Sequence, residues 1–155
     1  MVVEAKADEP FSKEVCDILN AAIERRIKSA RSNGLARVDQ LARSLFSPRA
    51  KSLPSIGSLR YQLLTATAAA LAEAERQGVG RAILVVQEFV TAKTADQNHE
   101  RNADDLLRFL RRLSGSTQAV FAAGQLHGPF QVPGPPLFAS GAVDLFVGKA
   151  RRNVR

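Results

Sequence analysis

The sequence has little of what secreted and membrane proteins carry. It contains a single cysteine, Cys16, so no internal disulfide can form. No apolar run approaches the roughly 20 residues that a membrane-spanning helix needs. The first residues carry charge where a signal peptide would have its apolar segment. We therefore expect a protein of the reducing cytoplasm that makes no contact with a membrane.

Residues that mark common functional sites are also scarce. There is no Trp and one Tyr, and the eight Phe fall mostly at expected core positions, so a stacking platform for single-stranded nucleic acid is not indicated. His99 and His127 lie far apart with no second ligand at short spacing, so we expect surface histidines and no zinc site. Cys16 lies on the apolar side of a predicted helix, which favours a core residue over a catalytic nucleophile.

What the chain does have is enough apolar residues for one core and an excess of positive charge. With 155 residues, 45% of them hydrophobic, we expect a single α/β domain over residues 1–150 and a basic tail over 151–155. The net charge of +7 favours a polyanionic partner such as DNA. Arginines recur on most of the predicted helices, however, so solvated helix faces explain the same charge.

The apolar pattern predicts a mixed sheet flanked by helices. A long helix follows Pro10, Asn33-Gly34 ends it, and Gly78 and Gly80 end a third, alanine-rich helix. Asn102 is the expected N-cap of a fourth helix, and the last strand is expected to be an edge or final strand. The expected strands are 2–6, 81–90, 117–123 and 143–149, and the expected helices are 10–27, 38–46, 59–74 and 102–113.

Glu4 and Lys6 are the residues with the clearest chemical potential. They are two apart on a predicted strand, so both side chains project from the same face. In metal-dependent cleavage of phosphodiesters, a carboxylate can hold Mg²⁺ while a neighbouring lysine orients the attacking water and offsets developing negative charge. The isolated pair is also what an ordinary exposed strand would carry.

Two segments extend this pattern. Residues 3–11, Val-Glu-Ala-Lys-Ala-Asp-Glu-Pro-Phe, are followed later by Leu-Arg-Tyr-Gln-Leu-Leu at 59–64, which opens the alanine-rich helix before an apolar strand. Up to about Phe89 the chain resembles a family of uncharacterised bacterial proteins related to the PD-(D/E)XK nucleases. The resemblance implies a partial restriction-endonuclease-like fold and a Mg²⁺-dependent nuclease acting on DNA.

The resemblance also implies roles for individual residues. Glu4 would be a metal ligand and Lys6 the catalytic lysine, Gln62 and Tyr61 would support them, and Arg60 would face a phosphate of DNA. The family's first metal-binding aspartate lies on a strand before this one, and the chain has no sequence there. Either the chain is N-terminally truncated, or Glu88 or Asp144 takes the place of that aspartate.

Truncation would leave the first strand as an open edge, so we expect a weakly stable N-terminus and self-association through that edge. Two alternatives remain for the function. The chain could be a non-catalytic module that binds nucleic acid or a protein and retains the nuclease scaffold. Residues 12–46 could instead form a helix-turn-helix in which Arg37 and Arg43 contact phosphates, a reading that we rank lower.

Overall fold

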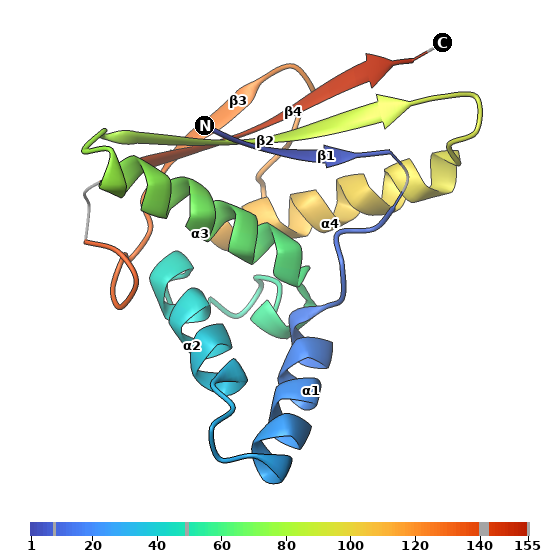
Figure 1. Cartoon of the computed structure of the whole chain (residues 1–155). Coiled ribbons are helices and arrows are strands. Elements are labelled where there is room, and N and C mark those ends of the chain that lie inside the picture. The colour runs from blue at the N-terminus through green and yellow to red at the C-terminus, as the bar shows by residue number, and fades with distance from the viewer. Residues whose placement is uncertain (8, 49, 140–142, 155) are drawn as a thin grey trace.

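The computed structural model describes residues 1–155 apart from 8, 49, 140–142 and 155. The described chain is an α/β fold with four strands, four α-helices and one short 3₁₀ helix (Figure 1). In chain order the elements are β1 (Val2–Lys6), α1 (Val15–Lys28), α2 (Gly34–Leu45), η1 (Ile56–Ser58), α3 (Tyr61–Arg76), β2 (Arg81–Val90), α4 (Asp96–Ser114), β3 (Leu126–Phe130) and β4 (Asp144–Asn153).

The four strands form one mixed sheet in the order β1-β2-β4-β3. β1, β2 and β4 are parallel, and β3 joins β4 in antiparallel orientation. β2 and β4 pair over ten residues, from Arg81 with Asp144 to Val90 with Asn153. The expectation of an edge position for the last strand was wrong, because β4 lies between β2 and β3.

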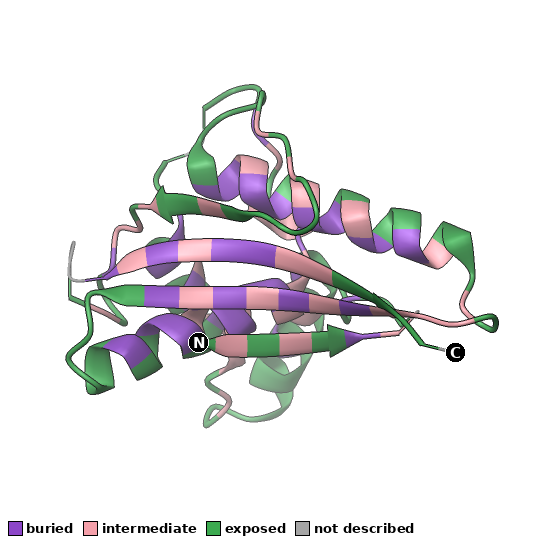
Figure 2. Cartoon of the chain, turned by 90° about the horizontal axis from the view of Figure 1, so that it is seen from above, coloured by how far each residue is buried: buried purple, intermediate pink, exposed green. Residues whose placement is uncertain are grey.

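All four helices lie on the same side of the sheet (Figure 1). Since β1, β2 and β4 follow one another across the sheet, both crossovers advance in the same direction and bring their helices to the same face. Figure 2 looks onto the other face, which no helix covers. Val3 and Leu126 are more than half exposed there, although parallel sheets are usually covered on both faces.

The core lies between the sheet and the helices. Leu84 and Val86 of β2 and Leu145 and Val147 of β4 alternate with more exposed residues and are buried against the helices. Leu63, Leu64 and Leu71 of α3, and Leu106, Phe109 and Leu110 of α4, complete this core. α1 and α2 pack beneath α3, so only α3 and α4 lie directly against the sheet (Figure 1).

The first helix begins later than its apolar pattern predicts. Phe11 is buried, Ser12 has a positive φ of 60°, and a short backbone pairing joins Glu14 to Arg60 before α1 starts at Val15. Only Val15 and Ala22 of α1 are buried. Cys16 is exposed, so the expectation of a core cysteine was wrong: α1 extends away from the sheet and buries a narrower stripe than its sequence predicts.

The fourth helix begins earlier than expected. α4 starts at Asp96, and Asn102 lies inside it, buried, with its Nδ2 donating to the carbonyl of Glu9 at 3.0 Å. Asn102 is therefore not an N-cap. Its amide ties the segment after β1 to the helix that follows β2, which fixes the chain beside Lys6.

The strand expected over residues 117–123 is also wrong, because these residues form turns and loop. β3 begins at Leu126 and contains Pro129, which an edge strand can accommodate because it needs fewer ladder hydrogen bonds. At the other end of the chain, β4 runs to Asn153. Most of the segment expected as a basic tail is thus paired strand, and Arg155 lies outside the described residues.

Candidate functional site

Charged side chains gather on the helix-covered face of the sheet, near the carboxyl ends of its parallel strands. Glu88 of β2 pairs with Lys6 of β1 on one side and with Arg151 of β4 on the other. Two residues earlier on β2, Val86 pairs in the same way with Glu4 and Lys149. Register partners on a sheet project from the same face. Because α3 and α4 both begin at this edge, these residues lie where open α/β sheets commonly bind ligands (Figure 1).

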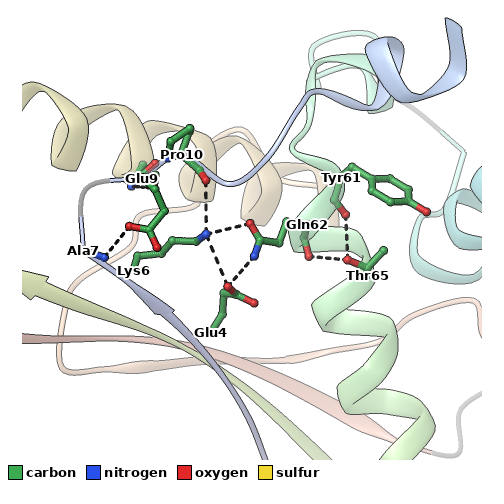
Figure 3. A network of polar contacts seen from close by, with 9 residues as sticks. Glu4, Lys6, Ala7, Glu9, Pro10, Tyr61, Gln62 and Thr65 are labelled. Carbon is green, nitrogen blue, oxygen red and sulfur yellow. Dashed lines mark hydrogen bonds and ion pairs between the residues drawn. The ribbon is translucent and has the colours of Figure 1, made fainter. Parts of the chain in front are cut away.

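Three of the predicted site residues are in direct contact. We call Glu4, Lys6 and Gln62 the Glu4 cluster (Figure 3). The ammonium of Lys6 donates to Gln62 Oε1 at 3.0 Å, and Gln62 Nε2 donates to Glu4 Oε1 at 2.6 Å. Lys6 Nζ also lies 3.6 Å from Glu4 Oε1. The resemblance assigns these three residues to one site, and the structure brings their side chains together; their chemical roles stay predictions.

Lys6 is the most enclosed member of the Glu4 cluster. Its side chain is 6% exposed, its Nζ lies 3.4 Å from the carbonyl oxygen of Pro10, and the ring centroid of Phe11 is 5.4 Å away. Glu4 is more open, with 22% of its side chain exposed. Both of its contacts use Oε1, and Oε2 has no partner among the described residues. Glu4 Oε2 is therefore the open position of the cluster.

The other two residues implied by the resemblance lie differently. Figure 3 shows the ring of Tyr61 directed away from Glu4 and Lys6, and its carbonyl accepts a hydrogen bond from Thr65. Arg60 Nε binds the buried carboxylate of Asp105 at 2.7 Å, and Arg60 Nη1 donates to the carbonyl of Ser12. Arg60 thus joins α3 to α4, and much of its guanidinium is already used within the fold.

A second group of charged residues adjoins the first. We call Glu88, His99, Lys149 and Arg151 the Glu88 cluster. Glu88 is 4% exposed, and its Oε1 lies 3.1 Å from Lys149 Nζ and 3.0 Å from His99 Nδ1. Arg151 Nε lies 3.7 Å from Glu88 Oε2, beyond hydrogen-bond length. One buried carboxylate thus faces two permanent cations and an imidazole.

His99 is buried, which corrects the expectation of a surface residue. Its Nδ1 is close to Glu88, but the N–H direction is not aligned for a hydrogen bond, and Nε2 has no hydrogen-bond partner among the described residues. His127 is partly buried: its Nε2 accepts from the amide of Ala122, and its ring centroid lies 4.6 Å from that of Phe121. The buried face of α4 therefore begins with a histidine whose ring nitrogens make no hydrogen bond to the described residues.

With this geometry in place, the comparison with protein families gives one match. Residues 1–153 match a family described as a domain of unknown function, DUF6946. The chain belongs to this family. No curated protein and no solved structure matches it. The function of this DUF6946 chain must therefore be argued from its own residues.

The two acidic residues considered as substitutes for the missing aspartate differ in position. Asp144 pairs with Arg81 at the start of β2, whereas Glu88 pairs with Lys6 near its end. Asp144 pairs with position 81 of β2 and Glu4 with position 86, a separation along the strand of about 17 Å, so Asp144 cannot join Glu4. Glu88 lies on the same face as Glu4, on the neighbouring strand, but cations contact both of its oxygens.

The donor set decides how a metal ion could be held in this DUF6946 chain. Among the described residues, no three His, Cys, Asp or Glu side chains are grouped as a metal site. Mg²⁺ keeps several waters and is commonly bound by one or two carboxylates together with substrate phosphates. The partly exposed, unpartnered Oε2 of Glu4 fits that arrangement. The residues therefore suit a Mg²⁺ ion that arrives with a phosphate, and they do not form a closed metal cage.

The surroundings of Cys16 disfavour a catalytic nucleophile. Desolvation, followed by the neighbouring carboxylates of Asp17 and Glu14, raises the pKa of its thiol above the ordinary value. The Sγ lies 3.6 Å from Glu14 Oε2. A thiol whose pKa is raised forms little of the reactive thiolate at neutral pH. Cys16 is exposed, but its thiol is not activated. We therefore do not include it in the candidate site.

A separate cavity of about 690 Å³ lies between α2, α3 and the loop that carries Leu137 and Phe138. Its walls include Ala68, Ala72 and Arg37. None of its lining residues belongs to the Glu4 or Glu88 cluster. The candidate site therefore consists of the polar residues at the strand ends, and this cavity is not part of it.

Sequence reasoning missed His99, Lys149 and Arg151. Lys149 and Arg151 are two apart on a strand, the spacing that identified Glu4 and Lys6, but the predicted strand ended at Lys149 and Arg151 fell in the expected basic tail. His99 and Asn102 extend the stripe of Leu106, Leu110 and Leu113 toward the start of α4 at helical spacing. Each signal was present in the sequence and depended on placing the ends of β4 and α4 correctly.

The described residues contain no helix with both the length and the apolar character needed to cross a membrane.

Proposed function

We propose that this DUF6946 chain is a nuclease-like protein with a partial restriction-endonuclease-like scaffold, which cleaves phosphodiester bonds of DNA with the help of Mg²⁺. The observation that carries the proposal is the mutual contact of Glu4, Lys6 and Gln62 at the carboxyl edge of the parallel strands. These are the three residues that resemblance to the PD-(D/E)XK nucleases assigns to catalysis. The net charge of +7 favours a polyanionic substrate.

In this proposal each residue has a defined task. Glu4 binds the metal through Oε2, while its Oε1 is held by Gln62. A bound Mg²⁺ ion would supply Lewis-acid polarisation of a phosphate oxygen. The Lys6 ammonium offsets the negative charge that develops at phosphorus. Gln62 fixes the distance between the carboxylate and the ammonium by bonding to both.

The test combines calorimetric binding of Mg²⁺ and Mn²⁺ with cleavage of plasmid DNA. The parent chain should bind metal and cut DNA, Glu4→Gln should lose both, and Lys6→Met should lose cleavage. Glu24→Gln and Lys28→Met, on the exposed surface of α1, are the matched controls and should behave as the parent. Absence of cleavage and metal binding in the folded parent would overturn the proposal.

A second candidate is a non-catalytic module that binds nucleic acid or a protein partner on the same scaffold. The burial of Lys6 favours it, because an ammonium enclosed by Gln62, Glu4 and Pro10 can serve as a fixed structural group. Such a module would shift DNA in a gel without cutting it, with or without Mg²⁺. DNA binding that persists in Glu4→Gln while cleavage is absent from the parent would select this candidate.

We also propose self-association through β1. This strand lies at the edge of the sheet, and its own residue Val3 is 52% exposed. A second copy could therefore add a strand to the free side of β1. Light scattering should show a dimer that Val3→Lys weakens, and a monomer at all concentrations would contradict it.

The cytoplasm remains our proposed location, since a single cysteine suits a reducing compartment.

A further inference from the structure

We infer that the Glu88 cluster binds a phosphate group, with Arg151 as the main contact. This inference deepens the proposed function, on which it partly rests, by naming the residues that hold a phosphate of the nucleic acid. It places that phosphate beside the Glu4 cluster, across β2 from Lys6. Arg60, which the resemblance assigned to phosphate, is engaged by Asp105 instead.

Arg151 has the free donors that such a site needs. Its Nε approaches Glu88 Oε2 only to 3.7 Å, and it makes no hydrogen bond to any described residue. The side chain is 51% exposed, so a ligand can reach it from solvent. A guanidinium presents a planar fork of N–H donors that matches two oxygens of a phosphate. The pairing of Arg151 with Glu88 on β2 keeps its backbone in place.

The charge balance of the cluster favours an anion. Glu88 is one carboxylate contacted by both Lys149 and Arg151. Lys149 is 13% exposed, so water screens its charge poorly. The adjacent carboxylates have cations of their own, Glu4 that of Lys6 and Asp105 that of Arg60. One positive charge is left over beside a partly buried lysine, and a phosphate would neutralise it.

α4 adds two further features on the same side. It begins at Asp96, just beyond the carboxyl end of β2, and the positive end of a helix dipole favours an anion nearby. One turn into the helix, His99 is buried beside Glu88, and its Nε2 has no hydrogen-bond partner among the described residues. A buried ring nitrogen without a hydrogen-bond partner is a second, independent indication that a polar partner is missing beside Glu88.

β4 itself provides a matched control. Arg152 follows Arg151, so its side chain projects from the opposite face of the strand, and no described residue binds it. Arg151→Gln and Arg152→Gln remove the same charge from neighbouring exposed positions and should both fold. Lys149→Met tests the buried cation, with circular dichroism to confirm its fold.

The experiment is an NMR and calorimetric titration of the full chain with inorganic phosphate, without metal. We expect binding in the parent and in Arg152→Gln, and a loss of affinity of about tenfold or more in Arg151→Gln. A second arm compares a short oligonucleotide with and without a 5′-phosphate: a preference for the phosphorylated one assigns the site to a terminal phosphate, and equal binding assigns it to the backbone.

The outcomes separate this inference from the proposed nuclease activity. Phosphate binding that depends on Arg151 in a chain that never cleaves DNA would uphold the site and reject the nuclease. Cleavage that is unchanged in Arg151→Gln, together with no phosphate binding in the parent, would overturn the site and retain the nuclease. Equal losses in Arg151→Gln and Arg152→Gln would show a general charge effect and would also overturn the site.

Discussion

Lys6 and Glu88 are register partners on neighbouring strands, yet each has its contacts elsewhere. Lys6 binds Gln62 and lies near Glu4, whereas Glu88 lies between Lys149 and Arg151. The carboxyl edge of the sheet therefore carries two polar clusters that share no described contact. Separate clusters should contribute separately to stability.

This separation predicts the outcome of two double-mutant cycles. Gln62→Leu and Glu88→Gln, one from each cluster, should be additive in free energy of unfolding within about 0.5 kcal/mol. Gln62→Leu and Lys6→Met, which break the same contact, should couple by about 0.5–3 kcal/mol. Urea denaturation of the parent, the three single variants and the two double variants measures both coupling energies. Strong coupling between Gln62 and Glu88 would show that the two clusters act as one.

Loss of the Glu88 carboxylate should be among the most destabilising polar changes in the chain. Glu88→Gln leaves Lys149, a poorly hydrated cation, without its carboxylate. Removing one partner of a buried ion pair costs about 3–5 kcal/mol, and we expect the lower end because Arg151 is half exposed. Chemical denaturation checks this. Asp39→Asn, which breaks the exposed Asp39–Arg43 pair, is the control and should change stability by about 0.5 kcal/mol or less.

Glu73 predicts a measurable pH dependence. Hydrogen bonds from Arg76 and then Gln77 lower the pKa of its carboxyl to about 2. The unfolded value is about 4.3, so its contribution to stability is present above that pH and is lost as the pH falls toward 2. Carboxyl NMR should show the low midpoint in the parent and a higher one in Arg76→Gln. An unchanged midpoint in that variant would refute the role of Arg76.

Gly128 tests the packing of β3 against β4, and Gly80 serves as its control. Gly128 has a φ of +140°, and an added Cβ would lie 2.6 Å from the carbonyl oxygen of Leu145 and 2.9 Å from the ring of Phe146. Gly128→Ala should therefore destabilise the chain by about 1–3 kcal/mol or more. Gly80→Ala meets nothing within 4 Å and should change stability by about 0.5 kcal/mol or less. Equal thermal midpoints for the two variants would contradict this packing.

The parts of the fold that the sequence predicts best are those with strong local patterns. β2 has the bounds expected from its short apolar run, which follows Gly78 and Gly80 and is rich in Val and Ile, features that favour a strand over a helix. α3 follows its alanine-rich stripe closely. Glu4 and Lys6 share a face because strand geometry alone requires it, and their contact with Gln62 agrees with the family resemblance.

The errors arose where distant residues decide the structure. The start of α1 depends on the pairing of Glu14 with Arg60, and residues 149–153 are ordered by β2, which no local pattern near the C-terminus shows. Cys16 has apolar neighbours at helical spacing, but whether that face is covered depends on where α1 lies relative to α3. Burial of His99 likewise follows from Glu88 on another element.

The order of the strands has a consequence for how the chain matures. β1 is synthesised before β2, and β4 after it, yet Glu4, Glu88 and Arg151 of these three strands gather at one edge of the sheet. A nascent chain that has emerged only as far as α4 already has Glu4, Lys6 and Gln62, but it leaves the buried carboxylate of Glu88 without Lys149 and Arg151. The two clusters can thus be complete only after β4 has been synthesised, and premature termination before residue 149 would remove both cations of the Glu88 cluster.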